Sequence, residues 1–274
     1  MRSGRSGGPG RALLGAHTLL VYLFLYGPIA VLAVFSFNAG RQTAIWEGFT
    51  LDWYRRLLAD DRLLAAAGNS LLVAAVATIA ATTLGTAAAL ALARQGARFR
   101  GRRATQGLLY LPVILPEVVL GAALLTFFGL ARLRLSLGTV IVAHVVFSLS
   151  YVAIVVRARL AGLDPSLAEA ARDLGAGPWE TFRRVTLPLA LPGIAAAALL
   201  VFTLSIDDYV VTSFVAGVGA TTLPLHIYSM LKVGVTPEVN AVSTLLLAVT
   251  IVPIVLAHRL LQGSPRPEAA RAEP

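Results

Sequence analysis

Six long segments with few or no charged residues most constrain what this chain of 274 residues can fold into. The hydrocarbon core of a bilayer is about 30 Å thick, so a helix needs roughly 20 apolar residues to cross it. The segments that meet this requirement are residues 12–40, 63–93, 104–131, 135–156, 185–206 and 239–258. We therefore predict an all-α polytopic membrane protein with six transmembrane helices.

Composition supports this class, because hydrophobic residues make up 57% of the chain and charged residues only 14%. The first apolar segment is too long for the core of a signal peptide, so we interpret it as a retained helix. We expect three regions: a disordered cytoplasmic N-terminus at 1–11, a membrane domain at 12–262 and a disordered cytoplasmic tail at 263–274.

The positions of the basic residues predict the orientation, since cytoplasmic loops carry an excess of arginine and lysine. A cytoplasmic N-terminus places most of them inside, together with both chain ends. Those left outside are Arg41, Arg55, Arg56, Arg62, Arg132, Arg134 and Lys232. Arg132 and Arg134 fit this assignment least well.

Several other classes of protein are excluded by what the chain lacks. The net charge of +9 comes from short loops between apolar segments, so we expect contact with lipid headgroups and none with nucleic acid. The chain has no cysteine and its four histidines are scattered, so we predict no metal site. Lys232 is the one lysine and follows no phosphate-binding loop. We therefore predict that the chain is not an enzyme.

Three carboxylates lie within or beside the apolar segments: Glu117, Asp207 and Asp208. An ionised carboxylate at the bilayer centre costs about 2.5–3.5 kcal/mol, so such residues usually face water or a partner. Pro112 and Pro116 favour a kink next to Glu117, where polar backbone is tolerated if it lines a cavity. These carboxylates are candidates for a path that conducts a cation.

Structural roles for the same carboxylates remain open. The aspartates could lie in water at the outer interface or pair with Lys232 or Arg134, and Glu117 could be protonated. For His144 we favour a hydrogen-bonded interior residue over a ligand. For Gly68, Gly85 and Gly121 we expect close helix packing.

A polar segment at about residues 158–190 separates two of the apolar runs. Asp164 and Pro165 predict a helix start, by capping and by proline at the first position, and Gly175 predicts its end. A second helix over 179–185 should end at Pro188. Two short helices of this kind form a knob that docks a partner, although a merely solvated loop is the alternative.

The order of residues in this segment resembles the cytoplasmic loop of ABC importer permeases. Glu169-Ala170-Ala171 is followed after three residues by Gly175 and, nine residues later, by a motif that ends in Leu187-Pro188. The resemblance implies the MetI-like importer-permease architecture in a bacterial inner (cytoplasmic) membrane. It also implies that these six residues contact a separate ATPase dimer. ATP and Mg²⁺ would bind to that ATPase, with no cofactor in this chain.

Three further stretches, 205–211, 222–230 and 234–241, look like the C-type permease of spermidine/putrescine importers. The resemblance implies a second, different permease chain and an extracytoplasmic solute-binding protein. Polyamines are linear cations, and carboxylates beside aromatic rings can hold ammonium groups. The expected substrate path comprises Glu117, Asp207, Asp208, Tyr209 and Tyr110.

Two other functions stay open at this point. One is import of a different solute, such as ferric iron, thiamine or an opine. The other is a membrane scaffold or receptor that docks a cytoplasmic partner without transport. An intramembrane enzyme is the weakest alternative.

Overall fold

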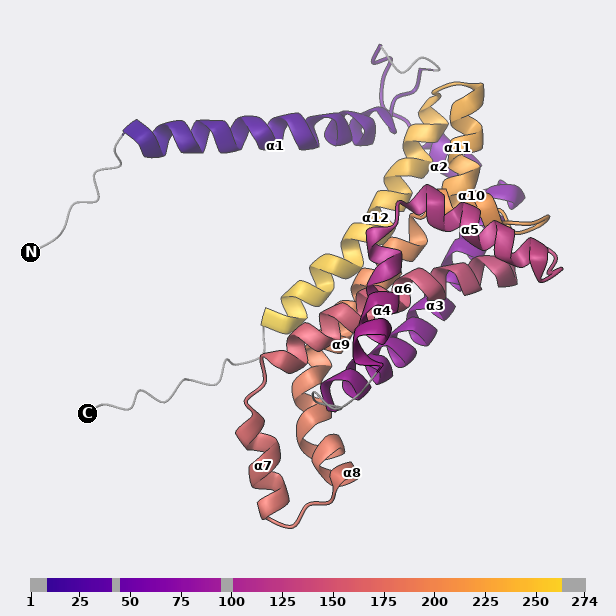
Figure 1. The fold of residues 1–274 in the computed structure, drawn as a ribbon. Helices are drawn as coiled ribbons and strands as arrows, with labels where there is room; N and C mark the ends of the chain where they lie inside the picture. Colours follow the sequence, from indigo (N-terminus) through magenta and orange to yellow (C-terminus); the bar gives the residue numbers. More distant parts are fainter. Residues whose placement is uncertain (1–8, 41–44, 95–100, 263–274) are drawn as a thin grey trace, which may run out of the picture. The chain divides into compact units, whose positions relative to one another are not determined.

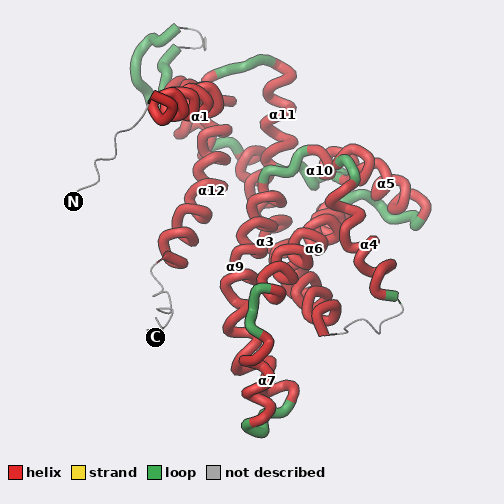
Figure 2. The backbone as a smooth tube through the Cα atoms, turned by 60° about the vertical axis from the view of Figure 1, so that its left-hand side comes forward, coloured by secondary structure: helices red, strands yellow, loops and turns green. Residues whose placement is uncertain are grey.

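The computed structural model describes residues 9–40, 45–94 and 101–262, and most of these residues form helices that are joined by loops (Figure 2). The described residues form no strand, and their one β-bridge joins Asn38 to Phe49 in a loop. The all-α prediction is therefore confirmed. Residues 1–8 and 263–274 of the expected tails lie outside the described residues, and α1 begins at Pro9.

Contacts divide the chain into two units, the first formed by residues 1–61 and 229–247 and the second by 62–228 and 248–274. Figure 1 shows the helices of both units, coloured in chain order. They are α1 (Pro9–Phe35), α2 (Asp52–Leu58), α3 (Asp61–Arg94), α4 (Arg102–Ile114), α5 (Glu117–Leu130), α6 (Leu137–Ala161), α7 (Pro165–Asp173), α8 (Pro178–Thr181), α9 (Leu187–Ile206), α10 (Val210–Val215), α11 (Leu223–Val233) and α12 (Pro237–Gln262).

In the first unit, the buried side chain of Asn38 organises the loop between α1 and α2. Its Nδ2 donates to the carbonyl oxygen of Ile45 at 2.7 Å, and its Oδ1 accepts from the backbone N–H of Glu47 at 2.8 Å. Trp53 Nε1 donates to the Asn38 carbonyl oxygen at 2.8 Å. These bonds satisfy the polar groups of a loop that has no regular secondary structure.

In the second unit, small side chains let α3, α6 and α9 pack closely. Ala81, Val152 and Ala197, one from each helix, belong to a single buried cluster. A Cβ on Gly85 would lie 2.6 Å from Val152 Cβ, and one on Gly121 would lie 2.6 Å from the ring of Phe214. The predicted close packing is confirmed for these two glycines. It is wrong for Gly68, whose Cβ position has no described atom within 4 Å.

The structure is consistent with six membrane spans without fixing that number. Among the residues that the structure describes, four helical stretches are long and apolar enough to cross a bilayer: residues 13–35, 61–93, 137–161 and 178–206. The expected third span is α4 and α5, bent by 112° between Ile114 and Glu117. Pro116 explains the break, because proline disfavours helical backbone at Leu115, which is extended with ψ 137°. The expected sixth span corresponds to α12, whose apolar part within the described residues is shorter than the four stretches above.

The predicted helix end at Pro188 is wrong. Helix α8, a π-helical turn at Phe182–Thr186 and α9 form one continuous helix from Pro178 to Ile206. The N–H of Leu187 donates to the carbonyl oxygen of Phe182, five residues back. This wider turn accommodates Pro188, whose ring would clash with the carbonyl of residue 184 in a regular α-helix.

Candidate functional site

Helix α7 begins where the sequence predicts. Asp164 accepts a hydrogen bond from the backbone N–H of Ser166 at 2.9 Å, and Pro165 occupies the first helical position. The backbone N–H and the side chain of Ser166 lower the pKa of the Asp164 carboxyl below its ordinary value of 3.8. The ionised carboxylate therefore stabilises the start of α7.

We expect low pH to loosen this helix start. Because the folded-state pKa is depressed, the contribution of Asp164 is fully present above its ordinary pKa and is lost as pH falls through the lower folded value. Amide hydrogen exchange in the first turn of α7, corrected for intrinsic rates, should accelerate below about pH 4. The variant Asp164→Asn caps without titrating and should remove this pH dependence; equal acceleration in both proteins would contradict the assignment.

Helix α7 ends in a Schellman motif that requires Gly175. The N–H of Ala176 donates to the carbonyl oxygen of Ala171 at 3.0 Å, and the N–H of Gly175 donates to that of Arg172 at 2.9 Å. Gly175 has φ +89°, a left-handed conformation that residues with a Cβ rarely adopt. The chain therefore reverses between α7 and α8 by means of a glycine.

The α7–α8 hairpin protrudes beyond the ends of α6 and α9 (Figure 1). Several of its side chains are exposed, including apolar ones. Glu169 and Ala170 are exposed, as are Leu174 at 90% and Trp179 at 70%. A cavity of about 480 Å³ separates the hairpin from the ends of α3 and α6. Exposed apolar side chains at the tip of such a protrusion are typical of a protein interaction surface. Of the other motif residues, Ala171 and Leu187 are partly buried and Pro188 is exposed.

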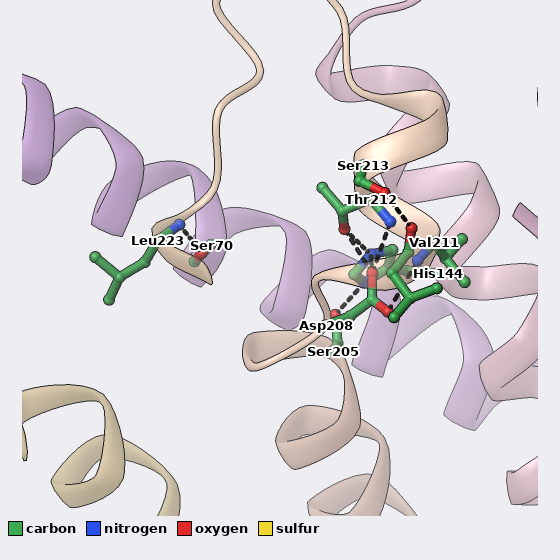
Figure 3. A network of polar contacts seen from close by, with 9 residues as sticks. Ser70, His144, Ser205, Asp208, Val211, Thr212, Ser213 and Leu223 are labelled. Atoms are coloured by element: carbon green, nitrogen blue, oxygen red, sulfur yellow. Dashed lines mark hydrogen bonds and ion pairs between the residues drawn. The ribbon is translucent and has the colours of Figure 1, made fainter. Parts of the chain in front are cut away.

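The second candidate site centres on Asp208, whose carboxylate lies in a buried hydrogen-bond network (Figure 3). Its Oδ2 accepts from the Thr212 N–H at 2.8 Å and from Thr212 Oγ1 at 2.6 Å, and its Oδ1 accepts from the Val211 N–H at 3.3 Å. His144 Nε2 lies 3.3 Å from Oδ2. Asp208 thus caps the first turn of α10 with both oxygens.

His144 completes this network and is itself fully buried. Its Nε2 lies 2.9 Å from Thr212 Oγ1 and its Nδ1 lies 2.7 Å from Ser205 Oγ. Because Thr212 Oγ1 donates its single proton to Asp208, Nε2 must carry a proton and donate it. The prediction that His144 is a hydrogen-bonded interior residue is confirmed.

Glu117 and Asp208 line the same small cavity of about 40 Å³, together with Pro112 and Tyr151. Glu117 is exposed and lies in the first turn of α5, beside the bend. Two carboxylates from segments distant in sequence therefore face one space. A cavity with this lining can accept a positively charged group.

The other three expected path residues lie elsewhere in the second unit. Asp207 is exposed at the C-cap of α9. Tyr209 packs on Tyr228 with ring centroids 4.3 Å apart. Tyr110 lines a different small cavity, with Gln106 and Arg157. Sequence reasoning missed Ser205, Thr212 and Tyr151 as neighbours of the carboxylates; the closeness of the two hydroxyls to Asp208 in sequence is the signal that points to them.

Comparison with known proteins identifies relatives along most of the chain. The model of the family described as "Binding-protein-dependent transport system inner membrane component" matches residues 81–264. The spermidine/putrescine transport system permease protein PotC of Escherichia coli K12 is 44% identical over 252 residues, which cover 92% of this chain and 94% of PotC. The putrescine transport system permease protein PotI of the same strain is 44% identical over 84% of this chain and 83% of PotI.

Among solved structures, a bacterial ABC transporter involved in the import of the acidic polysaccharide alginate has a similar fold. Its matching chain has a TM-score of 0.76 and 19% sequence identity, over 93% of this chain and 96% of that chain. The expected importer-permease architecture is confirmed.

Proposed function

Because this chain belongs to the family of binding-protein-dependent inner membrane transport components, we propose that its transported solutes are the polyamines spermidine and putrescine. The chain is a multi-pass permease subunit of an ABC importer and is not an enzyme. The observation that carries the choice of solute is the 44% identity to PotC over nearly the whole of both chains.

The chemistry of the second candidate site supports a cationic solute. Glu117 and Asp208 face one cavity, and Asp207 is exposed at the same end of α9. Carboxylates attract ammonium groups, and Tyr209 beside Asp207 offers an aromatic face. In this proposal Asp207 and Glu117 meet the cation directly, whereas Asp208 holds α10 in place.

In this proposal, different partners bind at the two ends of the second unit. The α7–α8 hairpin docks on a dimeric ATPase that binds ATP and Mg²⁺, and a second permease chain forms the other half of the translocation path. A solute-binding protein delivers the polyamine at the opposite end. Exposed Leu174 and Trp179 support the hairpin's role, because a partner that covers them would remove apolar surface from water.

This arrangement requires the hairpin and both chain ends to be cytoplasmic. We expect a reporter fused after Arg184 to score as cytoplasmic and one inserted after Gly219 to score as external, because the basic loops stay inside. Phosphatase and fluorescent-protein fusions at the two sites measure this. The reverse result at either site would contradict the orientation.

The identity of the solute is tested by measuring uptake in cells that lack their own polyamine importers. Expression of this chain with its partner subunits should restore saturable uptake of radiolabelled spermidine, competed by putrescine and not by thiamine. Co-purification of an ATPase without any polyamine uptake would leave the chain as a permease for another solute. Absence of an ATPase from the purified complex would favour a scaffold.

A further inference from the structure

We propose that Arg159, in the last turn of α6, is a positioning residue that makes a movement of the α7–α8 hairpin pass into α9. Helix α9 leads from the hairpin to the second candidate site, because it begins at Leu187 and has Asp207 at its C-cap. The inference rests on the proposed function, in which an ATPase acts on the hairpin.

The helix that leads away from the hairpin has a weak segment near its start. The π-helical turn at Phe182–Thr186 lies between α8 and α9, and Pro188 and Pro192 follow in the first part of α9. Proline has no N–H, so neither proline donates to the carbonyl group four positions earlier. A π-helical turn and missing hydrogen bonds are both places where a helix bends. Without support from outside, this segment would absorb a movement of the hairpin by bending.

Arg159 supplies this support from the neighbouring helix. Its Nε donates to the carbonyl oxygen of Leu189 at 3.0 Å, and Leu189 lies between the two prolines. A Cβ on the buried Gly193 would lie 2.6 Å from both Cβ and Cγ of Arg159. The methylene groups of the arginine therefore occupy the space that a side chain at position 193 would need. The two contacts hold adjacent turns of α9 against α6.

The rest of the interface between α6 and α9 is held by packing and by a second polar contact. Val156 of α6 and Ala197 of α9 belong to one buried cluster. At the far end of the interface, His144 Nδ1 lies 2.7 Å from Ser205 Oγ (Figure 3). The polar contacts of His144 and Arg159 lie about 22 Å apart along α6, at a helical rise of about 1.5 Å per residue. With Arg159 in place, α6 and α9 form one stiff pair between the hairpin and the carboxylates.

The contact uses one N–H of the arginine and does not require its charge. The donor is Nε alone, and the acceptor is a neutral backbone carbonyl oxygen. In glutamine, Nε2 is a donor at the same number of bonds from the backbone as Nε of arginine, and it carries no charge. Methionine has a side chain of the same length without a donor. These two substitutions separate the hydrogen bond from the positive charge that favours a cytoplasmic location.

The test measures the number of spermidine molecules accumulated per ATP hydrolysed, in proteoliposomes that contain the purified transporter and its binding protein. We expect Arg159→Met to lower this ratio roughly twofold to tenfold, the range to which the free energy of one hydrogen bond corresponds. ATP hydrolysis stimulated by the binding protein should continue, because the hairpin still docks on the ATPase. Arg159→Gln should keep the ratio near wild type, and the KM for spermidine should be unchanged in both variants.

A role of Arg159 in stability alone predicts a different result. Arg159→Met would then lower the amount of monodisperse transporter and leave the ratio unchanged in the protein that remains, which would overturn the inference. An equal loss in Arg159→Met and Arg159→Gln would overturn it as well, since the charge and not the hydrogen bond would then matter. A wild-type transporter that hydrolyses ATP without accumulating spermidine would instead refute the proposed function, together with the inference that rests on it.

Discussion

Replacing Gly175 by valine should abolish polyamine uptake while membrane insertion stays intact. Gly175 occupies the left-handed position of the Schellman motif that ends α7, and a Cβ there would meet no atom within 4 Å. The effect is therefore on the backbone alone. A penalty of about 1–3 kcal/mol for valine at positive φ lowers the population of the native turn roughly 5- to 150-fold. Uptake of radiolabelled spermidine and the amount of protein in the membrane measure the two outcomes.

Gly177→Val is the matched control for this experiment. Gly177 lies two residues further on in the same exposed loop, and its Cβ position is equally free of neighbours. Its backbone is extended, with φ −66° and ψ 167°, which valine adopts without strain. Uptake should therefore stay near wild type in this variant. Equal activity of the two valine variants would show that the conformation of the hairpin does not matter for transport.

Neutralising Asp208 should lower the amount of folded protein, whereas neutralising Asp207 should lower the uptake of spermidine. An amide at position 208 replaces one acceptor oxygen by a donor that faces the Val211 N–H or the Thr212 N–H and hydroxyl. Breaking a buried charged network of this kind costs about 3–5 kcal/mol. We expect Asp208→Asn to give aggregated protein in detergent, measured by size-exclusion chromatography.

Asp207→Asn and Glu117→Gln should fold normally, because both side chains belong to exposed residues. A hydrogen bond between a carboxylate and an ammonium group contributes about 1.5–3 kcal/mol, so the KM for spermidine should rise roughly tenfold or more. A folded, monodisperse Asp208→Asn protein would contradict the capping role. Unchanged uptake in both exposed variants would remove the cation path and leave the permease family unaffected.

Local chemistry made the start and the turn of the hairpin predictable. Asp164 followed by proline can cap a helix whatever surrounds it, and glycine after an alanine-rich helix favours a left-handed end. The course of the chain at Pro188 was not predictable in this way. Whether a proline ends a helix or is absorbed by a π-helical turn depends on hydrogen bonds that shift by one residue, and the sequence does not specify them.

The partner of Asp208 was also beyond sequence reasoning. The free-energy cost of placing a charged carboxylate in the bilayer correctly predicted that Asp208 has a partner. Lys232 and Arg134 were the basic residues considered for this role. The structure pairs Asp208 with His144, which lies 61 residues from Ser205 and 68 from Thr212 in sequence. Such a network depends on how α6, α9 and α10 pack together. The same is true of the cavity that Glu117 shares with Asp208, since residues from both sides of the 112° bend between α4 and α5 line it.

The central claim is that this chain conducts polyamines when an ATPase acts on its α7–α8 hairpin. Its most direct test is the ATP-dependent accumulation of radiolabelled spermidine in proteoliposomes that contain the purified transporter and its binding protein. We predict accumulation that requires ATP, Mg²⁺ and binding protein, that persists with Gly177→Val and that is lost with Gly175→Val. ATP hydrolysis stimulated by the binding protein without any accumulation of spermidine would contradict the claim.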